Sequence, residues 1–282
     1  MTELSLADGF AALNRGDLAA AGEACKQALA ANQKHVPAHF LVGLVALEGK
    51  QRQVAHEAFK SVVTLDRDHA AAWAHLAKLN VGEGRIAAAE SALREVRRIQ
   101  PSDPMVIELT GTVLNSLGEY EAAELFFERA HQMVPQSPSA LMNLGNVRVF
   151  LGKIDEAVAL FKRAIELEPN SAQCHWGLAN SEKAKDDSHI KTMQGLIDSG
   201  RQSKRSQGFL HYAIGKENED LGNWVDAFSA FTQGAQARRE TVEFSEADEA
   251  VMFEAIKETY TAEWLASAAP GAEDPAPIFV LG

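Results

Sequence analysis

Cysteine is scarce in this sequence. Cys25 and Cys174 are the only two among 282 residues, and they lie far apart without a Cys-x-x-Cys pair. This pattern favours neither a disulfide framework nor a structural zinc site. We interpret both cysteines as small core residues of a protein in a reducing compartment.

Long hydrophobic runs are also missing. No apolar segment approaches the roughly 20 residues that a membrane-spanning helix needs. The stretch from Met1 to Gly9 contains neither the basic region nor the apolar region of a secretory signal. We therefore expect a cytoplasmic protein that is not embedded in a membrane.

The chain has no excess of positive charge. It contains 27 Lys and Arg against 39 Asp and Glu, for a net charge of −12. Proteins that bind nucleic acid neutralise phosphates with Lys and Arg, so this balance argues against a nucleic-acid partner. The same balance argues against attraction to anionic membranes.

Proline and tyrosine are sparse, with nine and three residues respectively, while alanine is abundant. This composition favours helix over sheet. The hydrophobic fraction of 46% and the charged fraction of 23% are ordinary for a globular protein. The expected class is therefore an all-helical globular fold.

What the sequence does contain is a period of 34 residues. Small residues, core-sized residues, turn residues and prolines each recur at this spacing. The alanine ladder is Ala21, Ala55, Ala89, Ala123 and Ala157, and four residues later stand Cys25, Phe59, Leu93, Phe127 and Phe161. The other ladders are Gly9, Gly43, Ala77, Gly111 and Gly145; Gly16, Lys50, Gly84, Gly118 and Gly152; and Pro101, Pro135 and Pro169.

Each period predicts two helices joined by a turn. In the fifth unit, Leu141, Leu144 and Gly145 form one helical stripe, and Gly152 then permits a turn with positive φ. Small residues such as Gly145 and Ala157 let the two helices approach closely. Pro169 ends the second helix.

These ladders resemble the tetratricopeptide repeat (TPR) family, whose unit has 34 residues. The resemblance implies an all-α, right-handed superhelical solenoid of antiparallel helix pairs. Five regular units are predicted within residues 2–171, at 2–34, 36–69, 70–102, 104–136 and 138–171. The first two units lack the closing proline.

The pattern becomes irregular after residue 171. We predict an irregular sixth unit and a seventh TPR-like unit within 172–240, because no glycine turn follows Leu178 and Ala179. Polar residues from Arg201 to Ser206 are predicted to form a loop. A helix over 245–266, opened by Ser245, is predicted to cap the solenoid. Residues 267–282 are predicted to form a linker and the first strand of a downstream domain that is missing from this chain.

The C-terminal third resembles bacterial proteins that join TPR repeats to a sulfotransferase domain. The similar segments are Phe209 to Arg239, the helix from Ser245 to Ala266, and the run from Pro275 to Gly282. In that family such a run precedes a Pro-Arg-Ser-Gly-Thr-Thr-like phosphate-binding loop. The chain ends at Gly282, so the resemblance implies a catalytic domain beyond it and assigns no sulfuryl transfer to these residues.

No catalytic or cofactor motif is visible within the repeats, so we predict a chain that is not an enzyme and uses neither cofactor nor metal. His56-Glu57 lacks the second histidine of a zinc-protease motif. His39, His175 and His211 occupy equivalent first-helix positions and are interpreted as packing residues. Asp186, Asp187 and His189 are interpreted as a loop and a helix cap.

The first helices of such arrays line a concave binding surface. Residues one position after the small-residue ladder, and their neighbours, are expected to face it. The candidate site residues are Lys78, Thr112, Asn143, Asn146, Trp176, Asn180, Lys183 and Tyr212. Asparagine amides suit a peptide backbone, and Trp176 and Tyr212 offer large apolar anchors. The opposing interpretation is that the asparagines only solvate the groove while Trp176 packs under the next helix.

Three functions remain open. The first is a scaffold that binds a peptide or protein surface in its groove. The second is an accessory domain that presents acceptors to a sulfotransferase. The third is self-association through apolar N-terminal residues around Phe10, Phe40 and Leu44.

Overall fold

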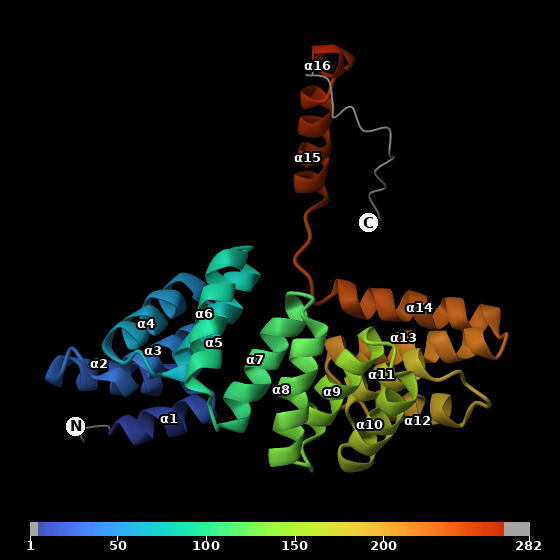
Figure 1. Ribbon diagram of the computed structural model, residues 1–282. Coiled ribbons are helices and arrows are strands. Elements are labelled where there is room, and N and C mark those ends of the chain that lie inside the picture. The colour runs from blue at the N-terminus through green and yellow to red at the C-terminus, as the bar shows by residue number, and fades with distance from the viewer. Residues whose placement is uncertain (1–4, 268–282) are drawn as a thin grey trace.

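A computed structural model describes residues 5–267, and this part of the chain consists of helices without strands. The regular units pair α1 (Leu6–Asn14) with α2 (Leu18–Ala31), α3 (Val36–Glu48) with α4 (Arg52–Leu65), α5 (Ala70–Gly82) with α6 (Ile86–Ile99), α7 (Pro104–Ser116) with α8 (Tyr120–Met133), and α9 (Pro138–Phe150) with α10 (Ile154–Leu167). They are followed by α11 (Ala172–Ser181), α12 (Ser188–Asp198), α13 (Lys204–Asp220), α14 (Trp224–Arg239), α15 (Glu246–Thr259) and α16 (Ala262–Ser267). Figure 1 shows the pairs stacked along one direction. The predicted all-α solenoid is confirmed.

A residue with positive φ separates the two helices of each regular unit. The five residues of the predicted turn ladder all have this conformation: Gly16, Lys50, Gly84, Gly118 and Gly152. Gly222 repeats it between α13 and α14, with φ of 79°. Lys50 is the only residue among these six that is not a glycine, and its φ is 57°.

Glycine and phenylalanine bring the helices of a unit together. A Cβ on Gly145 would lie 2.8 Å from ring atom Cε1 of Phe161, and a Cβ on Gly111 would lie 2.7 Å from Cε1 of Phe127. Real Cβ contacts are not this short, so the ring occupies the space that a side chain on the first helix would need. In the third unit the ladder has Ala77, and the partner is the smaller Leu93.

The first helices form the more tightly packed layer. Neighbouring first helices contact one another at α1–α3, α5–α7, α7–α9, α9–α11 and α11–α13, whereas the second helices of neighbouring regular units do not pack closely. Helices α3 and α5 have the weakest backbone contact within the first layer, although Phe40 of α3 lies 5.9 Å from His75 of α5, measured between ring centroids. The array is therefore closed on the side of the first helices and splayed on the side of the second helices.

Two apolar clusters form most of the core. One runs through the second to fifth units and includes Phe59 and Phe127. The other joins α11, α12, α13 and α14 through residues such as Met193 and Leu210. Cys25 and Cys174 are buried free thiols, as predicted.

The irregular sixth unit is held by a chain of polar contacts. His175 Nε2 lies 2.9 Å from the carbonyl oxygen of Pro169, and His175 Nδ1 lies 2.7 Å from Nε2 of His189. His189 Nδ1 in turn contacts Oε1 of Glu217 at 2.5 Å. This chain ties α12 to α11 and α13, although α12 packs mainly on α13 rather than pairing with α11.

The C-terminal part differs from the predicted arrangement. Helix α13 begins at Lys204, so the predicted loop ends earlier than expected. Helix α15 begins after Ser245, whose side chain accepts a hydrogen bond from the Asp248 amide. However, α15 and α16 extend away from α14, and none of their residues is buried, so this segment does not cover the last unit (Figure 1). The predicted strand near the C-terminus lies outside the described residues.

Among the described helices, none combines the length and the apolar character required to cross a bilayer.

Candidate functional site

A hollow of about 1200 Å³ lies beside α3 and α5, the pair of first helices with the weakest backbone contact. The first helices α1, α3, α5 and α7 supply most of its wall. Its lining residues are Leu13, Asn14, Gly16, Leu44, Leu47, Glu48, Lys50, Arg52, His75, Lys78, Leu79, Val81, Gly82, Met105 and Ser116. We call this cavity the inner hollow.

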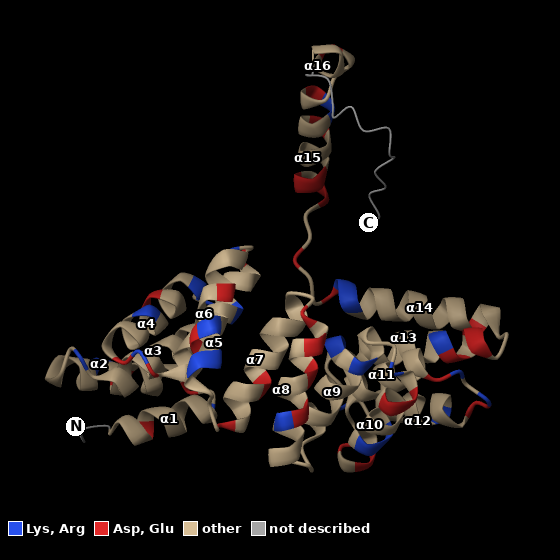
Figure 2. Ribbon diagram, in the orientation of Figure 1, with Lys and Arg blue, Asp and Glu red and all other residues tan. Residues whose placement is uncertain are grey.

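The inner hollow is apolar with a local excess of positive charge. Leucine, valine and methionine side chains alternate in its lining with Lys50, Arg52 and Lys78, against Glu48 as the one carboxylate. The whole chain carries a net charge of −12, so this excess runs against the overall balance. Figure 2 shows the charged residues of both signs interspersed along the helices elsewhere.

An aromatic cluster packs between α3, α4 and α5, and its member His75 also lines the inner hollow. His75 stacks on Phe59 with ring centroids 4.7 Å apart and an interplanar angle of 5°. Phe40 lies 5.6 Å from Phe59 and 4.7 Å from His69, measured between ring centroids. Burial lowers the pKa of His75 to about 4, with smaller effects from Lys78 and His69. His75 is therefore neutral at pH 7.

The predicted site residues fall into separate groups. Lys78 lines the inner hollow, together with Leu44 of the same ladder. Asn143 is held by the preceding unit, because its Nδ2 donates to Oε1 of Glu108 at 2.7 Å. The Thr112 hydroxyl donates to the Glu108 carbonyl within α7, at 3.0 Å.

Trp176 and Tyr212 come together across α11 and α13, with ring centroids 5.9 Å apart. Trp176 also packs against the second apolar cluster, which is the arrangement that the opposing interpretation expected. The Asn180 amide donates to the Trp176 carbonyl, at 2.8 Å. Asn146, Asn180 and Lys183 are exposed on the surface.

The histidines assigned to packing have a further role. His39 Nε2 and His175 Nε2 each lie 2.9 Å from the carbonyl oxygen six residues earlier, at Gln33 and Pro169. Trp73 Nε1 donates to the Arg67 carbonyl in the same way, at 2.9 Å. The ring at this ladder position therefore fixes the loop that precedes its unit.

Reasoning from the sequence missed the inner hollow and the polar chain through His189. The ladders could not reveal the hollow, because it depends on the spacing of α3 and α5. His189 was placed in the correct region, but only as a cap. Within residues 5–267, no group of three His, Cys, Asp or Glu side chains has a geometry suited to a metal ion.

A family model described as tetratricopeptide repeat matches residues 46–111 and 114–181. These two segments carry TPR repeats. Curated proteins gave no match to the sequence.

Solved structures of similar fold include the human IFIT1 dimer with PPP-AAAA, with a TM-score of 0.65 and 17% identity. That match covers 82% of this chain and 58% of IFIT1, so the chain spans little more than half of that protein. The Pseudomonas aeruginosa pilF protein has a TM-score of 0.54 and 22% identity, with 79% of this chain and 97% of pilF covered. The TPR protein TTC0263 of Thermus thermophilus has a TM-score of 0.52 and 22% identity, over 62% of this chain and 96% of its own. At these identities the matches show the fold alone.

Proposed function

We propose that this TPR-containing solenoid is a cytoplasmic protein-interaction scaffold that binds an extended, acidic and apolar segment of a partner on its first-helix face. The inner hollow is the observation that carries this proposal. Its leucines offer contacts for apolar side chains, while Lys50, Arg52 and Lys78 offer partners for carboxylates. The buried free thiols of Cys25 and Cys174 suit a reducing compartment.

The polar ladder extends this face beyond the inner hollow. Thr112, Asn146 and Asn180 follow Lys78 from unit to unit, and Trp176 and Tyr212 close the row. Asn143 is oriented by Glu108, which leaves its amide oxygen for a backbone N–H of the partner. We propose that this row, including Lys183 at its far end, guides the partner's backbone. We propose no catalysis, metal or cofactor for these residues.

A peptide library tests the proposal, because the selection itself reveals which ligand chemistry the face prefers. Random twelve-residue peptides are selected on the wild-type protein, and the affinities of the selected peptides are then measured for Lys78→Glu and for Lys34→Glu. Lys34 is exposed in the turn after α2 and serves as the matched control. We expect acidic, apolar peptides whose affinity falls about threefold or more in Lys78→Glu, since Lys78 is exposed and an exposed ion pair contributes up to about 1 kcal/mol. Equal binding by both variants would refute the role of the inner hollow.

The asparagine row has its own test. A triple variant with alanine at Asn143, Asn146 and Asn180 is expected to bind the selected peptides more weakly than the wild type does. If their affinity stays unchanged, the row does not contact the backbone.

One human IFIT1 structure contains PPP-AAAA, which raises nucleic acid as another ligand for this fold. The net charge of −12 argues against it for this chain, because phosphate binding requires a cationic surface. Self-association around Phe10, Phe40 and Leu44 is a further outcome. A molar mass that rises with concentration in light scattering would reveal it.

An accessory role beside a sulfotransferase is the second candidate, and the resemblance of Phe209–Arg239 and Ser245–Ala266 favours it. Sequencing the gene beyond the codon for Gly282 tests this role. A Pro-Arg-Ser-Gly-Thr-like loop would make acceptor peptides the ligands of the face, whereas a stop codon would remove the sulfotransferase link.

A further inference from the structure

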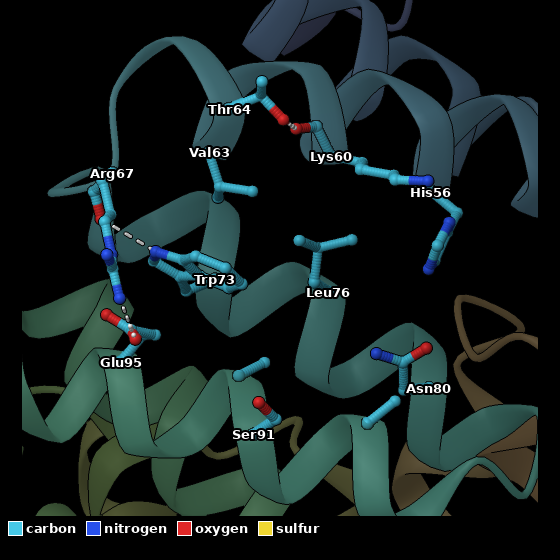
Figure 3. A pocket seen from close by; sticks show the side chains of 12 residues that line it. His56, Lys60, Val63, Thr64, Arg67, Trp73, Leu76, Asn80, Ser91 and Glu95 are labelled. Atoms are coloured by element: carbon cyan, nitrogen blue, oxygen red, sulfur yellow. Dashed lines mark hydrogen bonds and ion pairs between the residues drawn. The ribbon is translucent and has the colours of Figure 1, made fainter.

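A second cavity, of about 550 Å³, opens on the opposite side of α5, between α4 and α6 (Figure 3). We call it the outer pocket. Apolar side chains from all three helices contribute to it, including Val63, Trp73 and Leu76. The full lining is His56, Lys60, Val63, Thr64, Arg67, Trp73, Leu76, Asn80, Ala88, Ser91, Ala92 and Glu95. A volume of this size lies in the range of ligand sites, about 300–1,000 Å³.

The repeat ladder explains why the space is open here and filled in the next grooves. Ala92 on α6 stands at the position of Phe126 on α8 and Leu160 on α10. Phe126 and Leu160 both pack against the apolar core. Ala24 and Ala58 hold this position in the first two units, so the outer pocket lies at the last alanine before the larger side chains begin.

The floor of the pocket shows a second departure from the ladder. Asn80 occupies the position of Leu114 in the fourth unit and Arg148 in the fifth. Leu114 is fully buried, and Arg148 binds Glu124 and Glu128. Asn80 is neither apolar like Leu114 nor paired like Arg148. It is 5% exposed, and its Oδ1 is buried without a hydrogen-bond partner.

An unpaired buried amide oxygen costs stability, unless a donor reaches it. Figure 3 shows the amide of Asn80 near Leu76, with its oxygen on the side of His56 and its nitrogen on the side of Trp73. The oxygen accepts hydrogen bonds and cannot donate them, so it selects for a ligand with an O–H or N–H group. Because the surroundings are apolar, the group that carries this donor should itself be apolar.

The ends of the pocket are already defined by bonds. Trp73 is oriented by the hydrogen bond from its Nε1 to the Arg67 carbonyl, and Arg67 pairs with Glu95 at 3.0 Å. Lys60 stands at the opposite edge with His56 (Figure 3), and no described carboxylate lies within ion-pair distance of the Lys60 ammonium. One edge of the pocket therefore offers a positive charge to whatever enters.

We propose that the outer pocket binds an aromatic side chain with a hydrogen-bond donor, a tyrosine next to an acidic residue in a partner polypeptide. The ring lies along Leu76, from Trp73 towards His56. Its hydroxyl donates to Asn80 Oδ1, and the neighbouring carboxylate pairs with Lys60. This site is separate from the inner hollow, so one chain would hold two partners or two parts of one partner.

The probe is the dipeptide N-acetyl-Asp-Tyr-amide, compared with N-acetyl-Asp-Phe-amide and with p-cresol. Binding is followed by the indole N–H signal of Trp73 in ¹H–¹⁵N spectra of the full chain, assigned with Trp73→Phe. The tyrosine dipeptide is expected to shift this signal and to bind about 3- to 10-fold more tightly than the phenylalanine dipeptide, as one added hydrogen bond predicts. Lys60→Gln is expected to weaken both dipeptides and to leave p-cresol unchanged.

Three variants test the geometry. Ala92→Phe copies the filling of the next groove and should abolish binding, and Asn80→Leu should remove the preference for tyrosine. If Ala92→Phe does not fold, Ser91→Leu narrows the pocket from a more exposed position, copying Leu125. Ala159→Phe, an equivalent substitution on the exposed part of α10, is the control and should bind normally.

Four results would overturn the proposal. They are an unchanged Trp73 signal at saturating dipeptide, equal affinity for tyrosine and phenylalanine dipeptides, undiminished binding in both pocket-filling variants, and binding of p-cresol without binding of the dipeptide. The last result would assign the pocket to a small phenol rather than to a polypeptide.

Discussion

Phe161 on α10 lies against Gly177 on α11, so that a Cβ on Gly177 would stand 2.6 Å from ring atom Cε1. The same ring lies against Gly145 on α9. One phenylalanine thus closes the helix pair of its own unit and also receives the first helix of the next. Contacts between neighbours of this kind are what stabilise a solenoid.

Gly177→Ala should destabilise the protein by about 1–3 kcal/mol, because the added methyl group overpacks the Phe161 ring. Urea unfolding measures the free energy of unfolding. Gly22→Ala is the control: a Cβ there meets nothing within 4 Å, and alanine in a helix is more stable than glycine by up to about 1 kcal/mol. A similar stability change in the two variants would contradict the packing argument.

Lys50→Gly should stabilise the protein by about 0.5–1 kcal/mol. Lys50 holds a φ of 57°, a left-handed conformation that costs a residue with a Cβ about 1–2 kcal/mol. Glycine removes this cost, but part of the gain is offset because glycine loses more conformational entropy on folding. Gly84→Ala, at the same ladder position with φ of 70°, should change stability in the opposite direction. Thermal unfolding of both variants checks the pair, and two changes of equal sign would contradict it.

Acid should destabilise the protein through His75. Burial lowers its pKa from the ordinary 6.5 to about 4 in the folded state. As pH falls from 6.5 towards 4, the unfolded chain binds a proton at His75 that the folded chain does not bind. The stability that depends on a neutral His75 is fully present above pH 6.5 and is lost over this range. The expected loss between pH 7 and pH 4.5 is about 2–3 kcal/mol.

His75→Phe keeps an aromatic ring against Phe59 but cannot titrate. Its free energy of unfolding should therefore fall less over the same pH range, by about 2–3 kcal/mol, than that of the wild type. Parallel pH profiles would show that His75 is not the group responsible.

His189→Leu should destabilise the sixth and seventh units by about 2–4 kcal/mol. It would leave Glu217, which is 4% exposed, and the fully buried His175 without their shared partner. Hydrogen exchange should rise in α11–α13 and stay unchanged in α3–α6, because the two regions belong to different core clusters. A uniform rise along the chain would contradict this local effect.

The repeat spacing was sufficient to predict the fold, since one residue position per ladder carries one physical requirement. Gly84 and Gly152 must turn, Gly145 must be small, and Phe161 must fill the space beside it. The irregular α12 could not be predicted because a ladder says nothing about a unit that departs from it. There the structure depends on His189, which contacts partners 14 and 28 residues away.

The candidate site was predictable only in part. A ladder identifies which residues share a face, and Trp176 and Tyr212, which it places in one row, have ring centroids 5.9 Å apart. It does not reveal where that face is hollow. Lys78 lines the inner hollow because α3 and α5 have only weak backbone contact. The Asn143 amide is oriented by Glu108, and periodicity within one helix does not encode such a contact between units.

Helix α5, at the joint between the second and third units, is shared by the two cavities. Helix α5 turns one face, with Lys78 and His75, to the inner hollow and the other, with Trp73 and Asn80, to the outer pocket. A rocking motion of α5 that narrowed one cavity would widen the other. Ligands at the two cavities would then change each other's affinity reciprocally without being in contact. The pitch of the superhelix would differ according to which cavity is occupied.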